Sequence, residues 1–374
     1  MSGPPDLCGT SHRVVAPSSS REPGTLQAGI WQSQSSYLPA ASLAARADGS
    51  VVCVTCSGVV ILDAGAREIG RPTIPDNSAP SIAVAPDDTT YLLPGSELIS
   101  LSPAGDRRWL ALFIPGPPGP FETLGPPLVA GRAGAYLEGQ LASGDGSGST
   151  TATIVGFDAA TGARRRLATG QHLLGAARDG VFTVEGGHGG PSATLHQLDP
   201  AGKVVWSHAL SSTQDGLELR KAVAMPDGGA VVFGSTRSML EFGDRTLAAT
   251  SEVGFVAGFD AAGATRWAFA VTSFGIADIA VIAQDEILIA GRSVLGGAPQ
   301  DDAALAVATP AGIARTLDIG GTEDQVIRGL TVTPDGLAWV QIDSVPTDDP
   351  YTAVMHIGAH TFPEQGTYLF RLVP

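Results

Sequence analysis

One short phrase recurs along the chain and ends in a tryptophan in three of its copies. These copies are Ser102–Trp109 (SPAGDRRW), Asp199–Trp206 (DPAGKVVW) and Asp260–Trp267 (DAAGATRW). Looser copies without the tryptophan lie at Asp63–Glu68, Asp158–Arg166 and Thr309–Thr316. Such a repeat constrains the fold strongly, because every copy must form the same local structure and pack against its neighbours.

A second phrase alternates with the first and consists of an apolar run, a turn and another apolar run. It is clearest at Val223–Phe233 and Leu330–Val340, where Pro-Asp-Gly forms the turn. Proline presets φ at the first corner and glycine accepts a positive φ. The flanking residues alternate between apolar and polar with period two, which is the strand pattern. The other copies have their turns at Asp48, Asp87, Gly134, Asp179 and Asp285.

The two phrases together predict about four short strands in each of seven units. Four strands per roughly 45 residues are typical of an all-β fold, the β-propeller, most simply one with seven four-stranded blades. Six or eight blades remain possible, because the unit at Gly134 is degraded and residues 10–35 could supply extra strands. We expect residues 1–35 to be a flexible lead-in and 36–374 to form one propeller domain. The three tryptophans should lie buried on outer strands between blades.

The stretch Met239–Val271 resembles the bacterial secreted β-propeller repeat (the SBBP type), with its F-G motif, its D-x-x-G phrase and its Trp strand. The match extends over roughly residues 220–345, and elsewhere the chain is equally similar to quinoprotein-type repeats. Two departures are Gly258, where the family usually has lysine, and Asp158–Arg166, which lacks the tryptophan. The resemblance implies the fold and an exported bacterial protein, but no single activity, since one fold hosts many functions.

Composition limits the classes of partner. The formal net charge is −15 with a pI near 4.7, and such an acidic surface disfavours binding to nucleic acid and to anionic membranes. No apolar run is long enough to span a membrane. The segment Met1–Gly9 has no apolar core, so it is not a signal peptide as it stands. By resemblance we expect an extracellular, periplasmic or cell-surface protein, with a cytoplasmic one as the alternative, and a monomer.

Cys53 and Cys56 are the only closely spaced cysteines. They flank an expected hairpin turn, so they could form a structural disulfide or remain two buried thiols, and a redox or zinc role lacks the other residues it would need. The histidines do not have metal-ligand spacing, and His188 alone is expected in a glycine-rich loop. The sequence predicts no catalytic, cofactor-binding or metal-ligating residue and no cofactor. The seven histidines are His12, His172, His188, His196, His208, His356 and His360.

The unequal lengths of the units carry the functional hypothesis. Insertions are expected between the second and third strands of four units, at Gly139–Thr153, Thr236–Val253, Ser293–Asp302 and Val345–Pro350. Loops on a rigid scaffold are where binding sites arise. The chain is therefore interpreted as a non-enzymatic binding module whose rim loops capture a protein or carbohydrate. The alternative is an enzyme with a site at the axial pocket, namely a propeller lyase, a hydrolase or a quinoprotein-like oxidoreductase.

Overall fold

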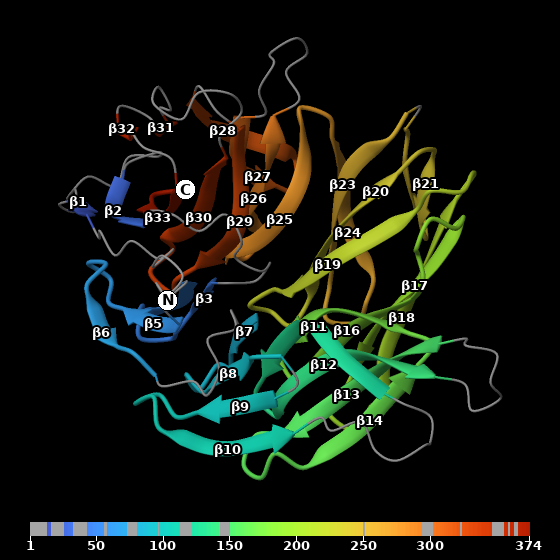
Figure 1. Cartoon of the computed structure of the whole chain (residues 1–374). Helices are drawn as coiled ribbons and strands as arrows, with labels where there is room; N and C mark the ends of the chain where they lie inside the picture. The colour runs from blue at the N-terminus through green and yellow to red at the C-terminus, as the bar shows by residue number, and fades with distance from the viewer. Residues whose placement is uncertain are drawn as a thin grey trace, which may run out of the picture. The chain divides into compact units, whose positions relative to one another are not determined.

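The computed structural model is built of β-strands and turns, with no helix in the residues it describes (Figure 1). Among these residues no helix could cross a membrane. The described residues are 13–15, 26–32, 43–55, 58–72, 81–95, 97–112, 122–142, 150–249, 251–293, 302–321, 324–345, 355–357, 360–362 and 366–374. Within them the strands form seven sheets, each with at least four strands, and neighbouring strands run antiparallel.

The chain divides into two compact units, and the second unit comprises residues 80–271 and 283–285. It contains four sheets, and each starts in one of the predicted repeat units. Their core strands are β7 (Ser81–Val84), β8 (Thr90–Leu93), β9 (Glu97–Leu101) and β10 (Arg107–Leu112); β11 (Glu122–Gly131), β12 (Gly134–Ala142), β13 (Thr150–Asp158) and β14 (Arg164–Thr169); β15 (His172–Ala177), β16 (Gly180–Gly186), β17 (Ser192–Leu198) and β18 (Val204–Ser212); and β19 (Glu218–Ala224), β20 (Ala230–Thr236), β23 (Val253–Phe259) and β24 (Thr265–Val271).

The first unit comprises residues 1–79, 272–282 and 286–374 and contains the other three sheets. Their strands are β3 (Leu43–Ala45), β4 (Val51–Thr55), β5 (Gly58–Leu62) and β6 (Glu68–Gly70); β25 (Phe274–Ala283), β26 (Glu286–Ser293), β27 (Asp302–Thr309) and β28 (Gly312–Gly321); and β29 (Asp324–Val332), β30 (Ala338–Val345), β33 (Gly366–Leu372), β2 (Leu26–Gln32) and β1 (Arg13–Val15).

Part of the segment expected as a flexible lead-in is regular structure. β2 pairs with β33 from the other end of the chain, with Trp31 opposite Tyr368, and β1 pairs with β2. The last sheet is thus completed by a strand from the beginning of the sequence. Its pairing partner is more than three hundred positions away, so no local pattern marks it.

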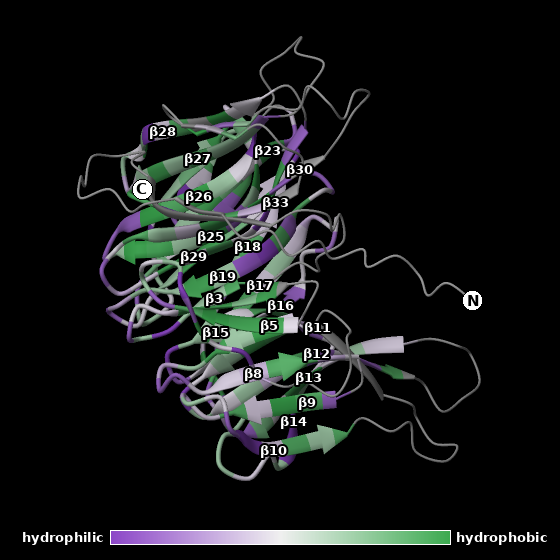
Figure 2. Cartoon of the chain, turned by 60° about the vertical axis from the view of Figure 1, so that its left-hand side comes forward, coloured by the Kyte–Doolittle hydropathy of each residue, from purple (hydrophilic) through white to green (hydrophobic). Residues whose placement is uncertain are grey.

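Successive sheets pack face to face inside each unit, as propeller blades do. In the second unit the first strands β7, β11, β15 and β19 contact one another in that order, and in the first unit β29 contacts β3. Apolar side chains fill the space between sheets, for example Leu98, Leu137 and Phe157. Figure 2 shows the same concentration of apolar residues in strands such as β26 and β27. The all-β propeller predicted from the repeat is confirmed.

The repeated phrases form the turns at one end of the strands. In the Asp-x-x-Gly turn, Asp260 Oδ1 accepts hydrogen bonds from the backbone N–H groups of Ala262 and Ala264, both at 2.9 Å. Gly263 has φ +83°, a conformation that glycine adopts without steric cost. In the Pro-Asp-Gly turn, Asp227 Oδ1 accepts from Gly229 N at 2.9 Å and Gly228 has φ +90°. Both turns thus follow from side-chain chemistry that acts within five residues.

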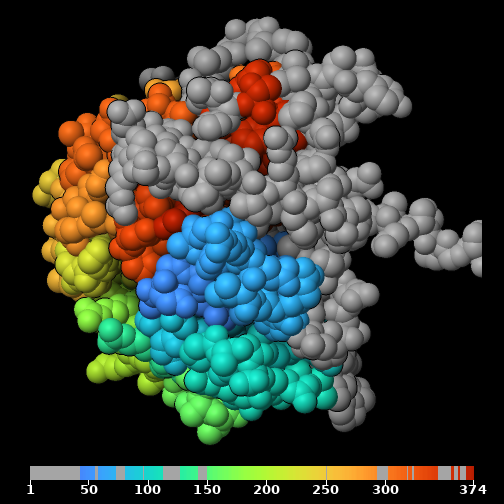
Figure 3. All heavy atoms as spheres, turned by 90° about the vertical axis from the view of Figure 1, so that its left-hand side faces the viewer, coloured from blue at the N-terminus to red at the C-terminus, as the bar shows by residue number. Residues whose placement is uncertain are grey.

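The repeated tryptophans lie on the fourth strands of their sheets. Trp206 and Trp267 are buried, with 7% and 5% exposure. Trp109 is only half-buried, so the prediction that all three are largely buried is wrong for this residue. It lies on β10, an outer strand that is at the surface in Figure 3 (cyan), where the neighbouring Leu112 is 53% exposed.

All four predicted insertions lie between the second and third strands of their sheets. One of them contains a short hairpin, β21 (Leu240–Phe242) with β22 (Arg245–Leu247). A second hairpin, β31 (Met355–Ile357) with β32 (His360–Phe362), lies in the same connection as the fourth insertion but after its predicted end at Pro350. Each hairpin joins the preceding sheet rather than its own. β21 pairs with β18, and β31 pairs with β28. Two sheets therefore have six strands. In each of them, a hairpin from the following repeat unit covers part of the outer edge.

Candidate functional site

Three loops of the second unit form one continuous surface at the strand ends opposite the Asp-x-x-Gly turns. They are the β16–β17 loop Gly187–Pro191, the β18–β19 connection Thr213–Leu217, and the hairpin β21–β22 with its flanking residues Arg237–Met239. We call this region the three-loop surface. It contains the predicted loop histidine, His188, and one of the predicted insertions.

Backbone hydrogen bonds join the first two loops. Gly189 N–H donates to Leu217 O at 3.0 Å, and in return Gly216 N–H donates to Gly189 O at 2.7 Å. Leu217 N–H donates to Gly190 O at 3.1 Å, and His188 forms an isolated antiparallel bridge with Glu218. The two loops are thus paired by backbone hydrogen bonds, as neighbouring strands of a sheet are.

Further bonds join the connection to the hairpin. Thr213 N–H donates to Met239 O at 3.1 Å, and Gln214 N–H donates to Ser238 Oγ at 3.1 Å. Ser238 Oγ also lies 2.6 Å from Ser212 Oγ. Leu240 and Phe242 of the hairpin are both fully buried and pack into the hydrophobic core. The loops therefore have a defined conformation while their outer side chains remain free to contact a partner.

Glycine is required at the crossing of these loops. Gly216 has φ +111°, and a Cβ there would lie 2.9 Å from Cδ of Arg237. The Arg237 side chain crosses over this glycine and donates to Glu252 at 3.1 Å. The sequence pattern marked the Thr236–Val253 insertion, but it gave no sign that Arg237 would lie on Gly216, because the two belong to different repeat units.

The exposed side chains of the three-loop surface are mostly polar and carry charges of both signs, and they include Arg237 and the apolar Met239. Gln214, Asp215, Glu241, Asp244 and Arg245 are exposed. Glu241 accepts a hydrogen bond from Ser211 Oγ at 3.1 Å. Among these described residues, no buried nucleophile lies beside a base.

The ring of His188, on this surface, contacts the ring of a second histidine, His172. His172, at the start of β15, lies with its Nδ1 2.9 Å from Glu138 Oε1 on β12. Its ring is 3.9 Å, centroid to centroid, from the ring of His188, with the planes 69° apart. Partial burial and then the neighbouring His172 lower the pKa of His188, while Glu138 and Glu218 act in the opposite direction. The sequence named both histidines but did not pair them, because they approach each other only when β15 and the β16–β17 loop take their places in one sheet.

The other histidines and Cys53, where the structure describes them, are not assembled into a site. His196 lies 3.0 Å from Ser207 Oγ, and His208 packs edge-on against Phe259. His356 and His360 lie on the paired strands β31 and β32. His12 and Cys56 lie outside the described residues, and Cys53 is a free, buried thiol on β4. In the described part of the chain, no three His, Cys, Asp or Glu residues are placed to hold a metal ion.

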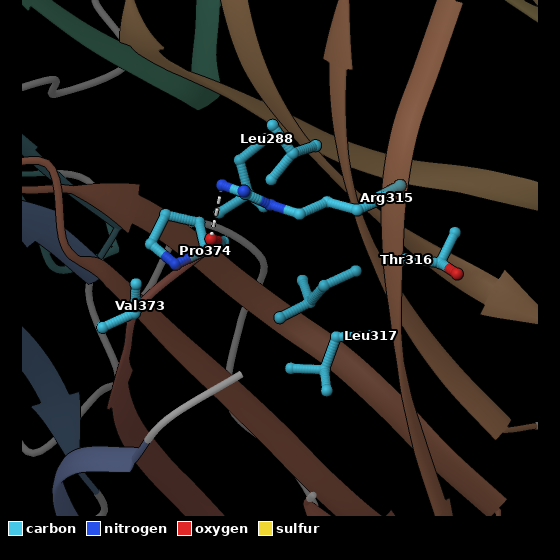
Figure 4. Close-up of a pocket in the computed structure, with 9 residues that line it drawn as sticks. Leu288, Arg315, Thr316, Leu317, Val373 and Pro374 are labelled. Atoms are coloured by element: carbon cyan, nitrogen blue, oxygen red, sulfur yellow. Dashed lines mark hydrogen bonds between the residues drawn. The ribbon is translucent and has the colours of Figure 1, made fainter. Parts of the chain in front are cut away.

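A small pocket of about 70 Å³ lies in the first unit (Figure 4). Its lining is mostly aliphatic, with Leu288, Leu305 and Leu317, and its one charged residue is Arg315. The Arg315 guanidinium donates to the backbone oxygen of Pro374 at 2.8 Å, and lies 3.7 Å from Glu286. This volume holds only a few water molecules, and the single charge is already engaged, so we do not regard it as a substrate site.

Comparison with known proteins supports the fold and no particular activity. No family model matches the chain, and no curated protein matches its sequence. A chain in the crystal structure of the mitotic checkpoint complex has 12% identity and a TM-score of 0.51, with 97% of this chain and 99% of that chain covered. The WD40 domain of Neurospora crassa Pan2 has 13% identity and a TM-score of 0.48, with 89% of each chain covered. The propeller of Dos1 has 11% identity and a TM-score of 0.48, with 93% of this chain and 86% of that chain covered.

Proposed function

We propose that this chain is a binding scaffold that captures a partner protein on the three-loop surface. The observation that carries the proposal is the set of hydrogen bonds that fixes three loops into one surface while leaving the outer side chains exposed. Preorganised loops lose little conformational entropy when a partner binds. The matched chain of the mitotic checkpoint complex is also part of a complex, which is an analogy of fold and not evidence of a shared partner.

The test reverses charge on the proposed surface. In the variant Asp215→Lys/Asp244→Lys, two exposed carboxylates of the three-loop surface become ammonium groups. The matched control is Asp106→Lys/Asp179→Lys, which changes the net charge equally at turns on the opposite ends of the strands. Both pairs are exposed, so all proteins should fold and melt alike.

The partner is sought by cross-linking and mass spectrometry in extracts of the cells that encode the chain. A partner that binds the parent and the control, but not the surface variant, supports the proposal. A partner that binds all three proteins equally, or is lost from both variants, contradicts it. Turnover of a substrate in a broad hydrolase, lyase and oxidoreductase screen would favour the alternative, an enzyme with a site at the axial pocket.

Membership of the secreted bacterial repeat family, and with it export from the cell, is also a proposal. It rests on the motifs of Met239–Val271, among them the F-G pair and the Asp-x-x-Gly-x-x-x-Trp phrase. Cell fractionation of a natural host with an antibody against the chain tests it. Detection in the extracellular, periplasmic or surface fraction is expected, and confinement to the cytoplasm would contradict it. Light scattering tests the expected monomer.

A further inference from the structure

The loop that carries His188 is unusually rich in glycine. It is the stretch Gly186–Pro191, in which His188 is flanked on each side by two glycines. Gly186, Gly187 and Gly189 have φ of +75°, +72° and +83°. Glycine adopts such angles readily but also leaves them readily, because it has no side chain to restrict the backbone. The loop can therefore move if its contacts are removed.

A histidine pair lies beside those contacts. The His188 ring is 3.9 Å from the ring of His172, and the loop backbone is bonded to the connection Thr213–Leu217. Two imidazolium cations at this distance repel each other, and the repulsion is strengthened where solvent is partly excluded. A second proton on the pair must be bound against that repulsion.

The carboxylates around the pair are already engaged. Glu138 Oε1 faces His172 Nδ1 at 2.9 Å, and Glu138 Oε2 accepts from Leu173 N–H at 2.9 Å. Glu218 on β19 is bonded to Arg220 at 2.9 Å. These groups, on β12, β15 and β19, are the charged side chains that face His188. Both carboxylates favour a charge on His188, but Glu138 also holds His172 and Glu218 also holds Arg220, and partial burial and the neighbouring His172 outweigh them.

We propose that the loop Gly186–Pro191 is a pH-sensitive switch of the three-loop surface. The loop is closed while at most one of His172 and His188 carries a proton, and it opens when both are protonated. Opening breaks the hydrogen bonds of Gly189, Gly216 and Leu217 and so releases the connection Thr213–Leu217. Loop opening concerns conformation alone, whereas its consequence, weaker partner binding in mildly acidic conditions, rests on the proposed function.

The closed loop favours a histidine pair with at most one proton. This preference sets the direction in which the population of the closed loop changes with pH. A closed state that disfavours protonated His188 is fully populated above the ordinary histidine pKa of about 6.5 and loses population as the pH falls below it. Carboxylates titrate near pH 4, so a change between pH 7.5 and pH 5 is assigned to histidine.

The experiment is hydrogen–deuterium exchange of the full chain at pH 7.5 and pH 5, with rates expressed as protection factors relative to the intrinsic rate at each pH. We expect the amides of Gly189, Gly216 and Leu217 to lose about tenfold in protection at pH 5, because the open loop no longer makes their hydrogen bonds. The amides of Gly228 and Gly263, in turns of the next sheet, serve as internal references and should not change.

Two variants separate the switch from general acid destabilisation. His188→Gln and His172→Gln each remove one charge of the pair, so the loss of protection at pH 5 should disappear in both. His356→Gln changes an exposed histidine on β31 and should behave as the parent. Unchanged protection in the parent at pH 5, or a loss that persists in His188→Gln, would overturn the proposal. Neither result depends on a partner, so the outcome is independent of the proposed function.

Discussion

The indole ring of Trp109 lies directly on Gly162 of the following sheet. A Cβ at Gly162 would be 2.8 Å from Cδ2 of the indole, and the indole N–H donates to Ala159 O of the same turn at 3.0 Å. Trp206 repeats the contact with Gly263, where a Cβ would lie 2.6 Å from the ring. Trp109 and Trp206 therefore each pack on the glycine of a turn in the next repeat unit, Asp158–Gly162 for Trp109 and Asp260–Gly263 for Trp206.

The first prediction concerns this glycine. Gly263→Ala should destabilise the chain by two effects: a positive φ of +83° costs an alanine roughly 1–2 kcal/mol, and the methyl group must displace Trp206. The control is Gly170→Ala, where φ is +77° but nothing lies within 4 Å of the added Cβ. Urea denaturation should show a larger loss for Gly263→Ala than for Gly170→Ala. Equal losses would mean that only backbone strain matters and that the ring adapts freely.

The second prediction ranks the tryptophans. Trp206→Ala should lower the free energy of unfolding by about 3–5 kcal/mol, the usual cost of removing a buried aromatic side chain. Trp109→Ala should cost less, because Trp109 is only half-buried while Trp206 is 7% exposed. The two losses are compared in the same denaturant series. An equal or larger cost for Trp109→Ala would show that burial does not set the ranking.

The sequence predicted those parts of the fold that depend on local chemistry. The Asp260 and Asp227 carboxylates bond to backbone groups within five residues, so their turns could be read from the phrase alone. The position of β2 could not, because its partner β33 lies at the other end of the chain and the pairing has no local signature. The contact between His172 on β15 and His188 in the β16–β17 loop was hidden for another reason, because the two rings approach each other only once β15 and β16 have paired.

The sequences of the two short hairpins resemble each other, and this similarity lies outside the main repeat. Leu240–Leu247 and Met355–Phe362 both have apolar residues at the first, third and eighth positions and a glycine at the fourth. This similarity indicates a hairpin in both places. It does not indicate which sheet the hairpin joins, and that choice is made by packing: Leu240 and Phe242 are buried in the core shared with Leu210 of the preceding sheet.

The third prediction concerns an ion pair in the last sheet. Arg371 donates to Asp335 at 2.6 Å, and Arg371 is largely buried. Burial acts to raise the pKa of Asp335, but the hydrogen bond from Thr333 and the Arg371 charge outweigh it and hold the pKa below its usual value. A carboxyl with a lowered pKa in the folded chain stabilises it above the unfolded pKa of about 3.9, and this contribution is lost as the pH falls through the folded value.

Asp335→Asn should therefore be less stable than the parent at pH 7, and the difference should shrink below about pH 4. Urea denaturation at pH 7 and pH 3 measures it, with Asp215→Asn on the exposed connection as the control. A difference between parent and Asp335→Asn that is the same at both pH values would show that the charge of Asp335 contributes nothing.

The fourth prediction concerns thiol reactivity. Burial raises the pKa of Cys53 to about 12, and its neighbours Leu43, Val60 and Leu62 are apolar. Because the thiolate is the reactive form, Cys53 should not be alkylated in the native, reduced chain at pH 8, and should react after denaturation. Peptide mapping by mass spectrometry measures both states. A peptide that carries both cysteines and is lighter by two hydrogen atoms in a nonreducing digest would instead support the Cys53–Cys56 disulfide, which stays a prediction, since the structure describes Cys53 in its reduced form.

The last prediction concerns Gly258, where the secreted repeat family that Met239–Val271 resembles usually has lysine. Gly258 lies opposite Trp267 on the neighbouring strand, and a Cβ there would be 2.3 Å from Cε2 of the indole. The ring thus covers the glycine itself, and any side chain at this position must displace it. Gly258→Ala should destabilise the chain by displacing the buried Trp267, and Gly258→Lys, the usual family residue, should do the same to a greater extent.

A double-mutant cycle isolates the contact. If the cost of Gly258→Ala arises from the ring, then it should be much smaller in a Trp267→Ala background, because the space above the glycine is empty there. Each protein is unfolded in urea, and the coupling is the difference between the two costs. Costs that add, with no coupling, would show that Gly258 is needed for its backbone and not for the tryptophan that lies on it.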